Sequence, residues 1–267
     1  MTKLETDERR VYDTFARDLE SGRDVVDRSS YEIIIDSKRK QILKKTIENM
    51  DGIILDYGCG EGRYCGFLAS LGKDAVGIDL SAQLLRIGQK KQRHPAACFV
   101  CCDALNLPFR SRRFDTAVCL GVLHHVDLDT ALLELKRVLR NGGSLVCFEP
   151  NVICPPSFIG RKLYRTRAHT ELERPFLPWN LIKRIEAAGF SIQDVSYLSP
   201  IGFAWSWLLP AIHKGGRTRH QSKIRNVARV LRRLDTALET RSPLKYLSWA
   251  VNITSVKQQT EPASQRT

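Results

Sequence analysis

The chain has 267 residues, of which 43% are hydrophobic, and its formal net charge is +13. This composition supports one sizeable core and excludes a disordered, collagen-like or disulfide-scaffold chain. The N-terminal segment Met1–Asp27 is charged and polar, without the apolar region of a signal peptide. No run of about 18 apolar residues predicts a membrane-spanning helix. We therefore expect a cytoplasmic protein.

The positive charge is concentrated in the second part of the chain. Residues 1–150 have a net charge of +1, whereas residues 151–267 have a net charge of +12. The second part is therefore expected to face the substrate or an anionic surface. We expect a single domain made of a helical cap (1–50), an α/β core (51–151) and a basic segment that completes the sheet (152–267).

Two helices are predicted before the core. Val11, Phe15 and Leu19 recur at four-residue spacing in Asp7–Glu20, which is typical of an amphipathic helix. A second helix is predicted over Tyr31–Asn49.

Short apolar runs alternate with helical segments from Gly52 onward. The predicted strands are Ile53–Leu55, Asp74–Asp79, Ala97–Cys102, Phe114–Leu120 and Ser144–Phe148. One helix is predicted to end at Leu71, and a second to begin after Ser81, which would cap it. A third is predicted over Asp127–Arg140, followed by a turn at 141–143. Strands that alternate with helices predict an α/β fold with a doubly wound, mostly parallel sheet.

The pattern is looser after Glu149. A helix closed by Gly189 is predicted over Pro178–Ala188, and a strand over Ser191–Leu198. A further helix is predicted over Ser222–Thr240 and a final strand over Tyr246–Val256.

Eight cysteines raise the question of a metal or disulfide framework. Cys98 and Cys101 form a single CxxC with no second pair to complete a metal site. They lie in an apolar run that predicts a buried strand, so we interpret them as reduced core thiols and expect no metal.

The glycine-rich segment Asp56–Gly62 directly follows an apolar strand and precedes a helix. Glycines allow a sharp turn and a close approach of the backbone to a ligand. A dinucleotide fingerprint starting at Gly58 would need its third glycine where Arg63 stands. The motif of a phosphate-binding P-loop is also absent.

Three aspartates follow three successive strands. Asp56, Asp79 and Asp103 are separated by 23 and 24 residues, each interval fitting one strand–helix unit. The three carboxylates are therefore expected on one edge of the sheet. The carboxylate of Asp79 can accept hydrogen bonds from ribose hydroxyls. The carboxylate of Asp103 can accept one from an exocyclic amine, such as that of adenine.

The segment from Ile53 to Asn151 resembles the class I S-adenosylmethionine-dependent methyltransferases, of the type 11-like group. Five segments are similar to successive motifs of that family: ILDYGCGEGRY, VGIDLS, CCDALNLPF, FDTAVCLGVLHHV and LKRVLRNGGSLVCFEPN. The resemblance implies a seven-stranded Rossmann-like methyltransferase fold with S-adenosyl-L-methionine as cofactor.

The resemblance also implies a role for each matching position. Asp56, Gly58, Gly60 and Gly62 would surround the methionine portion of the cofactor. Asp79 would hold the ribose with Leu80 against adenine, Asp103 and Ala104 would contact the adenine edge, and Leu120 would lie near the sulfonium. Tyr57 and Cys59 depart mildly from the commonest residues of the family.

Catalytic residues are harder to recognise, because methyl transfer relies mainly on positioning. His124 and His125 follow the fourth strand and are expected near the sulfonium, where one can accept a proton. Glu149 and Asn151 follow the fifth strand and are candidates for orienting an acceptor. The alternative for all four is ordinary packing and loop chemistry. Tyr12 and Phe15 are candidates for a lid, or for simple helix packing.

The sequence is compatible with several classes of acceptor. Basic clusters at residues 161–167 and 214–233, beside the aromatic tract 203–209, favour a lipid or lipid-linked acceptor, and an anionic membrane surface. The alternative is an ordinary amphipathic helix with a solvated basic face. A small-molecule acceptor is also compatible. GEGRY and VLHHV are similar to the tRNA wobble-uridine methyltransferases, so RNA is a competing acceptor. A third possibility is a non-catalytic protein that binds S-adenosylmethionine.

Overall fold

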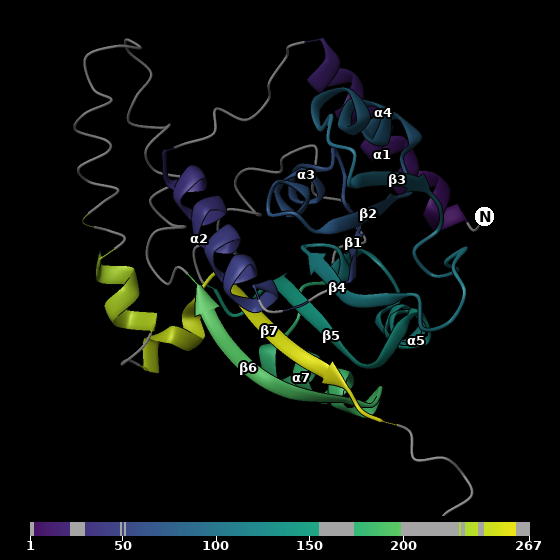
Figure 1. Cartoon of the computed structure of the whole chain (residues 1–267). Coiled ribbons are helices and arrows are strands. Elements are labelled where there is room, and N and C mark those ends of the chain that lie inside the picture. Colours follow the sequence, from purple (N-terminus) through teal and green to yellow (C-terminus); the bar gives the residue numbers. More distant parts are fainter. Residues whose placement is uncertain are drawn as a thin grey trace, which may run out of the picture.

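The computed structural model describes residues 3–21, 30–48, 50, 52–154, 174–198, 230, 233–239 and 243–259. These residues contain one seven-stranded sheet with the strand order β3-β2-β1-β4-β5-β7-β6 (Figure 1). The strands are β1 (Ile53–Tyr57), β2 (Asp74–Asp79), β3 (Ala97–Cys101), β4 (Phe114–Leu120), β5 (Leu139–Pro150), β6 (Phe190–Leu198) and β7 (Ala250–Lys257). The pairs among β1–β5 are parallel, whereas β7 is antiparallel to both β5 and β6. The predicted α/β fold is confirmed.

Six α-helices whose two ends both lie among the described residues accompany the sheet. They are α1 (Lys3–Glu20), α2 (Ser30–Ile47), α3 (Arg63–Ser70), α4 (Ala82–Lys91), α5 (Leu128–Val138) and α7 (Pro178–Ala187). Two short 3-10 helices are η1 (Leu123–His125) and η2 (Pro243–Leu247). Ser81 caps α4 as predicted, since its side chain accepts a hydrogen bond from the Leu84 amide. None of the helices described here combines the length and the hydropathy that a membrane-spanning helix needs.

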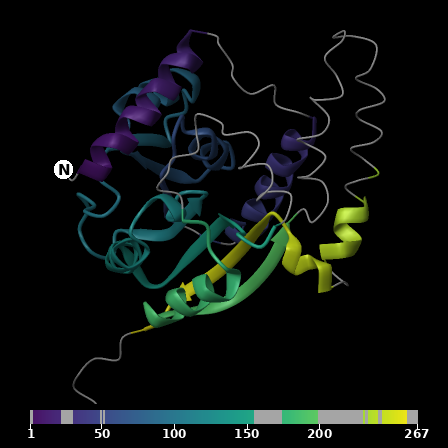
Figure 2. The same ribbon diagram turned by 180° about the vertical axis from the view of Figure 1, so that it is seen from behind.

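Alternate residues of the central strands face two separate cores, as the two-residue period of a strand requires. Leu55 and Tyr57 of β1 pack in the core that α5 and α7 cover. Ile54, between them, packs in the core beneath α2 and α3. Figures 1 and 2 show these helices distributed over the two faces of the sheet. This two-sided covering fixes the sheet and leaves its strand ends available for a site.

Three sequence predictions are corrected by the structure. The helix predicted to reach Arg140 ends at Val138, and β5 starts at Leu139 and runs through residues 141–143, where a turn was expected. The ammonium group of Lys257 donates hydrogen bonds of 2.7 Å to the carbonyls of Lys136 and Leu139. These bonds supply partners for carbonyl groups at the end of α5, which have none within the helix. The last strand begins at Ala250 rather than at the predicted Tyr246, because Tyr246 lies in the 3-10 helix η2.

The third correction concerns the CxxC pair. Cys98 and Cys101 are exposed rather than buried, because β3 is the edge strand and pairs only with β2. All eight cysteines lie in the described part of the chain, and all are free thiols.

Most of the predicted basic and aromatic features lie outside the described residues. These features are the clusters at 161–167 and 214–233, the tract 203–209, and most of the helix predicted over Ser222–Thr240. Residues 233–239 of that helix are helical.

The carboxyl ends of the parallel strands share one edge of the sheet. α1 packs beside α4 next to this edge, through Ala16 against Leu84 and Ile87 (Figure 2). The N-terminal helix therefore lies beside the strand ends that carry the predicted site.

Candidate active site

The loop after β1 has the backbone that its glycines allow. Gly58, Gly60 and Gly62 have φ values of 72°, 55° and 69°, in the left-handed region that residues with a Cβ avoid. A Cβ on Gly58 would lie 2.4 Å from Cγ2 of Val122. The loop therefore passes directly against the turn after β4, which brings the ends of β1 and β4 together.

Asp79 connects this loop to the end of β2. Its Oδ2 accepts a hydrogen bond of 2.8 Å from the Gly60 amide, and its Oδ1 accepts one of 2.9 Å from the Ser81 amide. Burial raises the pKa of this carboxyl, while the backbone amides of Ser81 and Gly60 act against that rise. Each oxygen has a further lone pair, so the carboxylate can also accept hydroxyl groups of a ligand.

Asp56 is a buried acid with an unsatisfied oxygen. The residue is 2% exposed, and burial raises the pKa of its carboxyl to about 7, with the nearby charge of Asp79 adding to the rise. No group in the described part of the chain forms a hydrogen bond with its Oδ2. A buried carboxylate without a partner is costly, so this oxygen is suited to a positively charged ligand group.

Arg39 of α2 supplies a complementary charge that the sequence did not reveal. Its guanidinium carbon lies 3.9 Å from the centroid of the Phe148 ring and 5.0 Å from that of Trp249. Its Nε is buried and has no hydrogen-bond partner among the residues described. Arg39 is therefore fixed by aromatic stacking and has a donor free for an anionic group.

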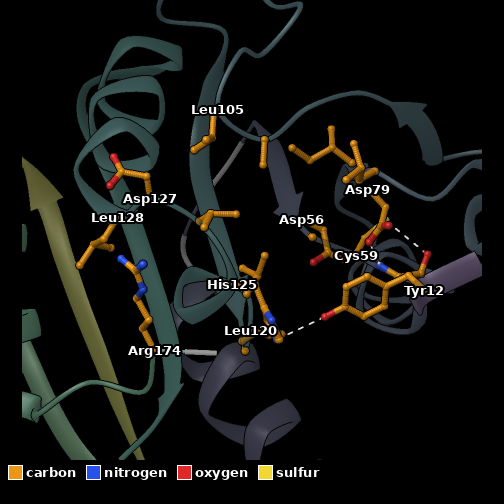
Figure 3. Close-up of a pocket in the computed structure, with 18 of the residues that line it drawn as sticks. Tyr12, Asp56, Cys59, Asp79, Leu105, Leu120, His125, Asp127, Leu128 and Arg174 are labelled. Atoms are coloured by element: carbon orange, nitrogen blue, oxygen red, sulfur yellow. Dashed lines mark hydrogen bonds between the residues drawn. The ribbon is translucent and has the colours of Figure 1, made fainter. Parts of the chain in front are cut away.

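A cavity of about 1220 Å³ lies at these strand ends (Figure 3). Most residues predicted to bind a cofactor line it, together with one predicted catalytic residue: Asp56, Gly58, Gly60, Asp79, Leu80, Asp103, Ala104, Leu120 and His125. Its volume exceeds the roughly 300–1,000 Å³ of a typical small-ligand pocket, which leaves space for two ligands side by side.

Four predicted site residues in the described part of the chain do not line the cavity: Gly62, His124, Glu149 and Asn151. Gly62 is the N-cap of α3, where a Cβ would lie 2.4 Å from the Phe99 ring. Glu149 is fully buried, and its Oε1 accepts hydrogen bonds from the amides of Val122 and Leu123. Its Oε2 lies 2.7 Å from Nδ1 of His124. Glu149 and His124 therefore stabilise the turn after β4 from outside the cavity.

Asn151 also has its polar atoms engaged within the protein. Its amide nitrogen donates to the carbonyls of Tyr246 and Ser248, and its Oδ1 accepts from the Ile153 amide. These contacts join β5 to the segment before β7.

His125 differs from His124 because its ring faces the cavity. Nε2 of His125 lies 3.3 Å from the hydroxyl of Tyr12, which α1 brings across the cavity (Figure 3). The two rings meet edge to face, with centroids 5.9 Å apart. The side chain of Phe15, the other lid candidate, lies outside the described residues.

Tyr57 supports the predicted adenine end of the cavity. Its hydroxyl donates a hydrogen bond of 2.8 Å to the Ala104 carbonyl, while Oδ1 of Asp103 accepts one of 2.8 Å from the Leu105 amide. Burial raises the pKa of Tyr57 well above its ordinary value, so the phenol keeps its donor proton. This tyrosine, a departure from the family pattern, therefore anchors the loop after β3.

The described residues contain no group of three His, Cys, Asp or Glu side chains that could hold a metal ion.

Comparison with known proteins shows what the chain is similar to. Residues 55–147 match a family model described as a methyltransferase domain. An uncharacterized protein of Methanocaldococcus jannaschii is 36% identical over 105 residues, which are 39% of this chain and 44% of that protein. The tRNA (carboxymethyluridine(34)-5-O)-methyltransferase of Xenopus tropicalis is 36% identical over 102 residues, 36% of this chain and 15% of that protein. The matches thus span less than half of these relatives.

A solved structure extends the likeness beyond the core. The geranyl diphosphate C-methyltransferase of Streptomyces coelicolor aligns with a TM-score of 0.58 at 17% identity, over 83% of this chain and 79% of that one. The fold is therefore that of the class I S-adenosylmethionine-dependent methyltransferases.

Proposed function

We propose that the protein is an S-adenosylmethionine-dependent methyltransferase that acts on a small-molecule acceptor. One observation carries this proposal. The unsatisfied oxygen of Asp56 and the unsatisfied Nε of Arg39 belong to residues lining the same cavity as Asp79. An amino-acid tail offers one ammonium and one carboxylate, which matches these two groups in sign.

The cofactor assignment follows from the chemistry of the lining. Asp79 would accept the ribose hydroxyls, and Leu80, Asp103 and Ala104 would meet adenine. Asp56 would hold the ammonium and Arg39 the carboxylate of the methionine portion. The left-handed Gly58 and Gly60 leave space for that tail, and Leu120 would lie beside the sulfonium.

When bound, the cofactor supplies a methyl group on a sulfonium, which is already an activated leaving group. The protein then has to orient the acceptor, exclude water and accept a proton where the acceptor carries one. His125 is the residue we assign to the proton, because it lines the cavity and His124 does not. Tyr12 would orient the imidazole through its hydroxyl.

We assign His124 and Glu149 a positioning role rather than contact with the reacting atoms. Glu149 accepts the two amides of the turn and binds His124, so it fixes the backbone that carries His125. The catalytic role expected for these two residues from the sequence would then be indirect.

A second candidate function is methylation of tRNA, as in the name of the Xenopus tropicalis relative. Sequence similarity over 36% of this chain favours it. A lipid or lipid-linked acceptor, an anionic membrane contact, and a cytoplasmic location remain proposals from the sequence. The segments behind the membrane proposal lie outside the described residues.

Two measurements test the proposal. Calorimetry with S-adenosylhomocysteine should give one site per chain, and no heat of binding would refute cofactor use. Tritiated S-adenosylmethionine is then incubated with fractionated cell extract. Label in small metabolites supports the main proposal, label in tRNA or in the lipid fraction selects those alternatives, and binding without transfer to any fraction selects a non-catalytic protein.

A further inference from the structure

The cavity changes the sign of its charge from one half to the other. The half at the ends of β1 to β3 is lined by four carboxylates and two guanidiniums, those of Asp56, Glu61, Asp79, Asp103, Arg39 and Arg63. The half formed by η1, α7 and the segment before α7 is lined by Arg174, Lys183, Arg184 and a single carboxylate, Asp127. A net negative half suits a sulfonium and an ammonium, whereas a net positive half suits an anion.

We infer that the acceptor is a small molecule with an oxyanion, a carboxylate or a phosphate, which Arg174 and Lys183 bind. This inference rests on the proposed function, because it assigns the second half of the cavity to the acceptor.

The backbone places Arg174 next to the proposed proton acceptor. Its amide donates a hydrogen bond of 2.9 Å to the carbonyl of His124, the residue before His125. Figure 3 shows its guanidinium in the cavity, near Leu128 and apart from Asp79. An anion on Arg174 would therefore hold the rest of the acceptor close to His125.

Among the described residues, one of the three cations has an ion-pair partner. Arg184 is paired with Asp129, with Nη2 at 2.7 Å from Oδ1. Neither Arg174 nor Lys183 forms an ion pair with a carboxylate of the described chain. Asp127, the lining acid of this half, accepts hydrogen bonds from the amide and hydroxyl of Thr130, which hold its pKa below the usual range, and the charges of Arg184 and Arg174 lower it further.

Arg174 and Lys183 lie nine positions apart, Arg174 just before α7 and Lys183 within it. Asn180 and Lys183, three residues apart on α7, lie on one face of the helix and both line the cavity. A planar guanidinium can bind a carboxylate or phosphate through two hydrogen bonds, and a lysine adds a second charge. Because both side chains are exposed, their attraction should weaken as the salt concentration rises.

The test uses the full chain saturated with S-adenosylhomocysteine. Inorganic pyrophosphate and malonate, as phosphate and carboxylate probes, are titrated at low salt by calorimetry. The double variant R174A/K183A is compared with K44A/K45A, which removes the same charge from exposed positions on α2. S-adenosylhomocysteine is itself titrated into each of the three proteins, so that a failure of cofactor binding is recorded separately.

We expect wild type to bind at least one probe with a Kd of the order of millimolar, and R174A/K183A to bind it at least about tenfold more weakly. K44A/K45A should stay within twofold of wild type, and S-adenosylhomocysteine affinity should be the same in all three. Preference for pyrophosphate indicates a phosphate acceptor, and preference for malonate a carboxylate acceptor. No binding by wild type, equal binding by R174A/K183A, or an equal loss in K44A/K45A would overturn the inference.

A second arm examines the methylated product. Tritium from labelled S-adenosylmethionine should appear in small molecules that an anion-exchange column retains. Label in the unretained fraction, in lipids or in acid-precipitated RNA would overturn the inference while leaving the methyltransferase proposal intact.

Discussion

The hydroxyl of Tyr12 lies 3.3 Å from Nε2 of His125, although 113 positions separate the two residues in the sequence. This contact joins α1 to the turn after β4, across the cavity (Figure 3). It makes the N-terminal helix part of the site, and it singles out His125 from its neighbour His124. The first prediction follows from that distinction.

Replacing His125 by alanine should lower kcat by roughly 10²–10⁴-fold if the imidazole accepts a proton during transfer. The affinity for S-adenosylhomocysteine should stay within twofold, because the proposed cofactor half of the cavity is unchanged. Tritium transfer into the extract fraction that wild type methylates provides the rate. H94A, at an exposed histidine outside the cavity, is the matched control. An H125A variant as active as H94A would remove His125 from the mechanism.

Replacing Asp79 by alanine should weaken S-adenosylhomocysteine binding by about 1–3 kcal/mol, the usual cost of lost hydrogen bonds at a buried polar site. Asp74 stands at the other end of β2 and is exposed, so D74A removes the same charge from the same strand. Calorimetry should separate the two variants clearly. Equal affinity of D79A and D74A would contradict the assigned ribose contact.

The affinity for S-adenosylhomocysteine should depend on pH through Asp56. Its pKa of about 7 leaves the carboxyl mostly protonated at pH 6, and an ammonium binds the ionised form better. Affinity should therefore fall as the pH drops below 7, by up to about tenfold per pH unit. The D56N variant should bind more weakly at pH 8 and show little change with pH. A wild-type profile as flat as that of D56N would contradict the assignment.

The same group should make unfolding depend on pH in the absence of ligand. Because the pKa of Asp56 is higher in the folded than in the unfolded chain, the folded state holds more protons between about pH 4 and 7. The free energy of unfolding contributed by this residue should therefore decrease as the pH rises through that range. Urea unfolding of wild type and D56N at several pH values checks the sign, and a contribution that increases would refute it.

The G58A variant should lose more stability than G72A, although both glycines have positive φ. Gly72, at φ 75°, has no atom within 4 Å of an added Cβ, so alanine there should cost only the backbone strain of about 1–2 kcal/mol. At Gly58 the added Cβ also collides with Val122. Urea unfolding measures the difference, and S-adenosylhomocysteine affinity should fall only in G58A. Equal stability of the two variants would contradict the close approach of the loop to the turn.

Local signals in the sequence predicted the fold well. Apolar runs and strand–helix intervals were enough to anticipate β2 and β4 with their observed bounds. The spacing of Asp56, Asp79 and Asp103 anticipated three acids that line one cavity. These features depend on neighbouring residues and on the repeat of one structural unit, which a sequence displays directly.

The missed features depend on packing between distant segments. Arg39 stacks on Phe148 and Trp249, and no local pattern announces such a contact. Cys98 looks like a core residue until the strand order makes β3 an edge. Glu149 resembles a catalytic acid by position, yet the backbone turn it supports engages its Oε1.

A crystal structure of the full chain with S-adenosylhomocysteine tests the central claim most directly. We predict that both ribose hydroxyls bind the Asp79 carboxylate, while the ammonium meets Asp56 and the carboxylate meets Arg39. A ligand in any other place, or one whose ribose faces away from Asp79, would contradict the account.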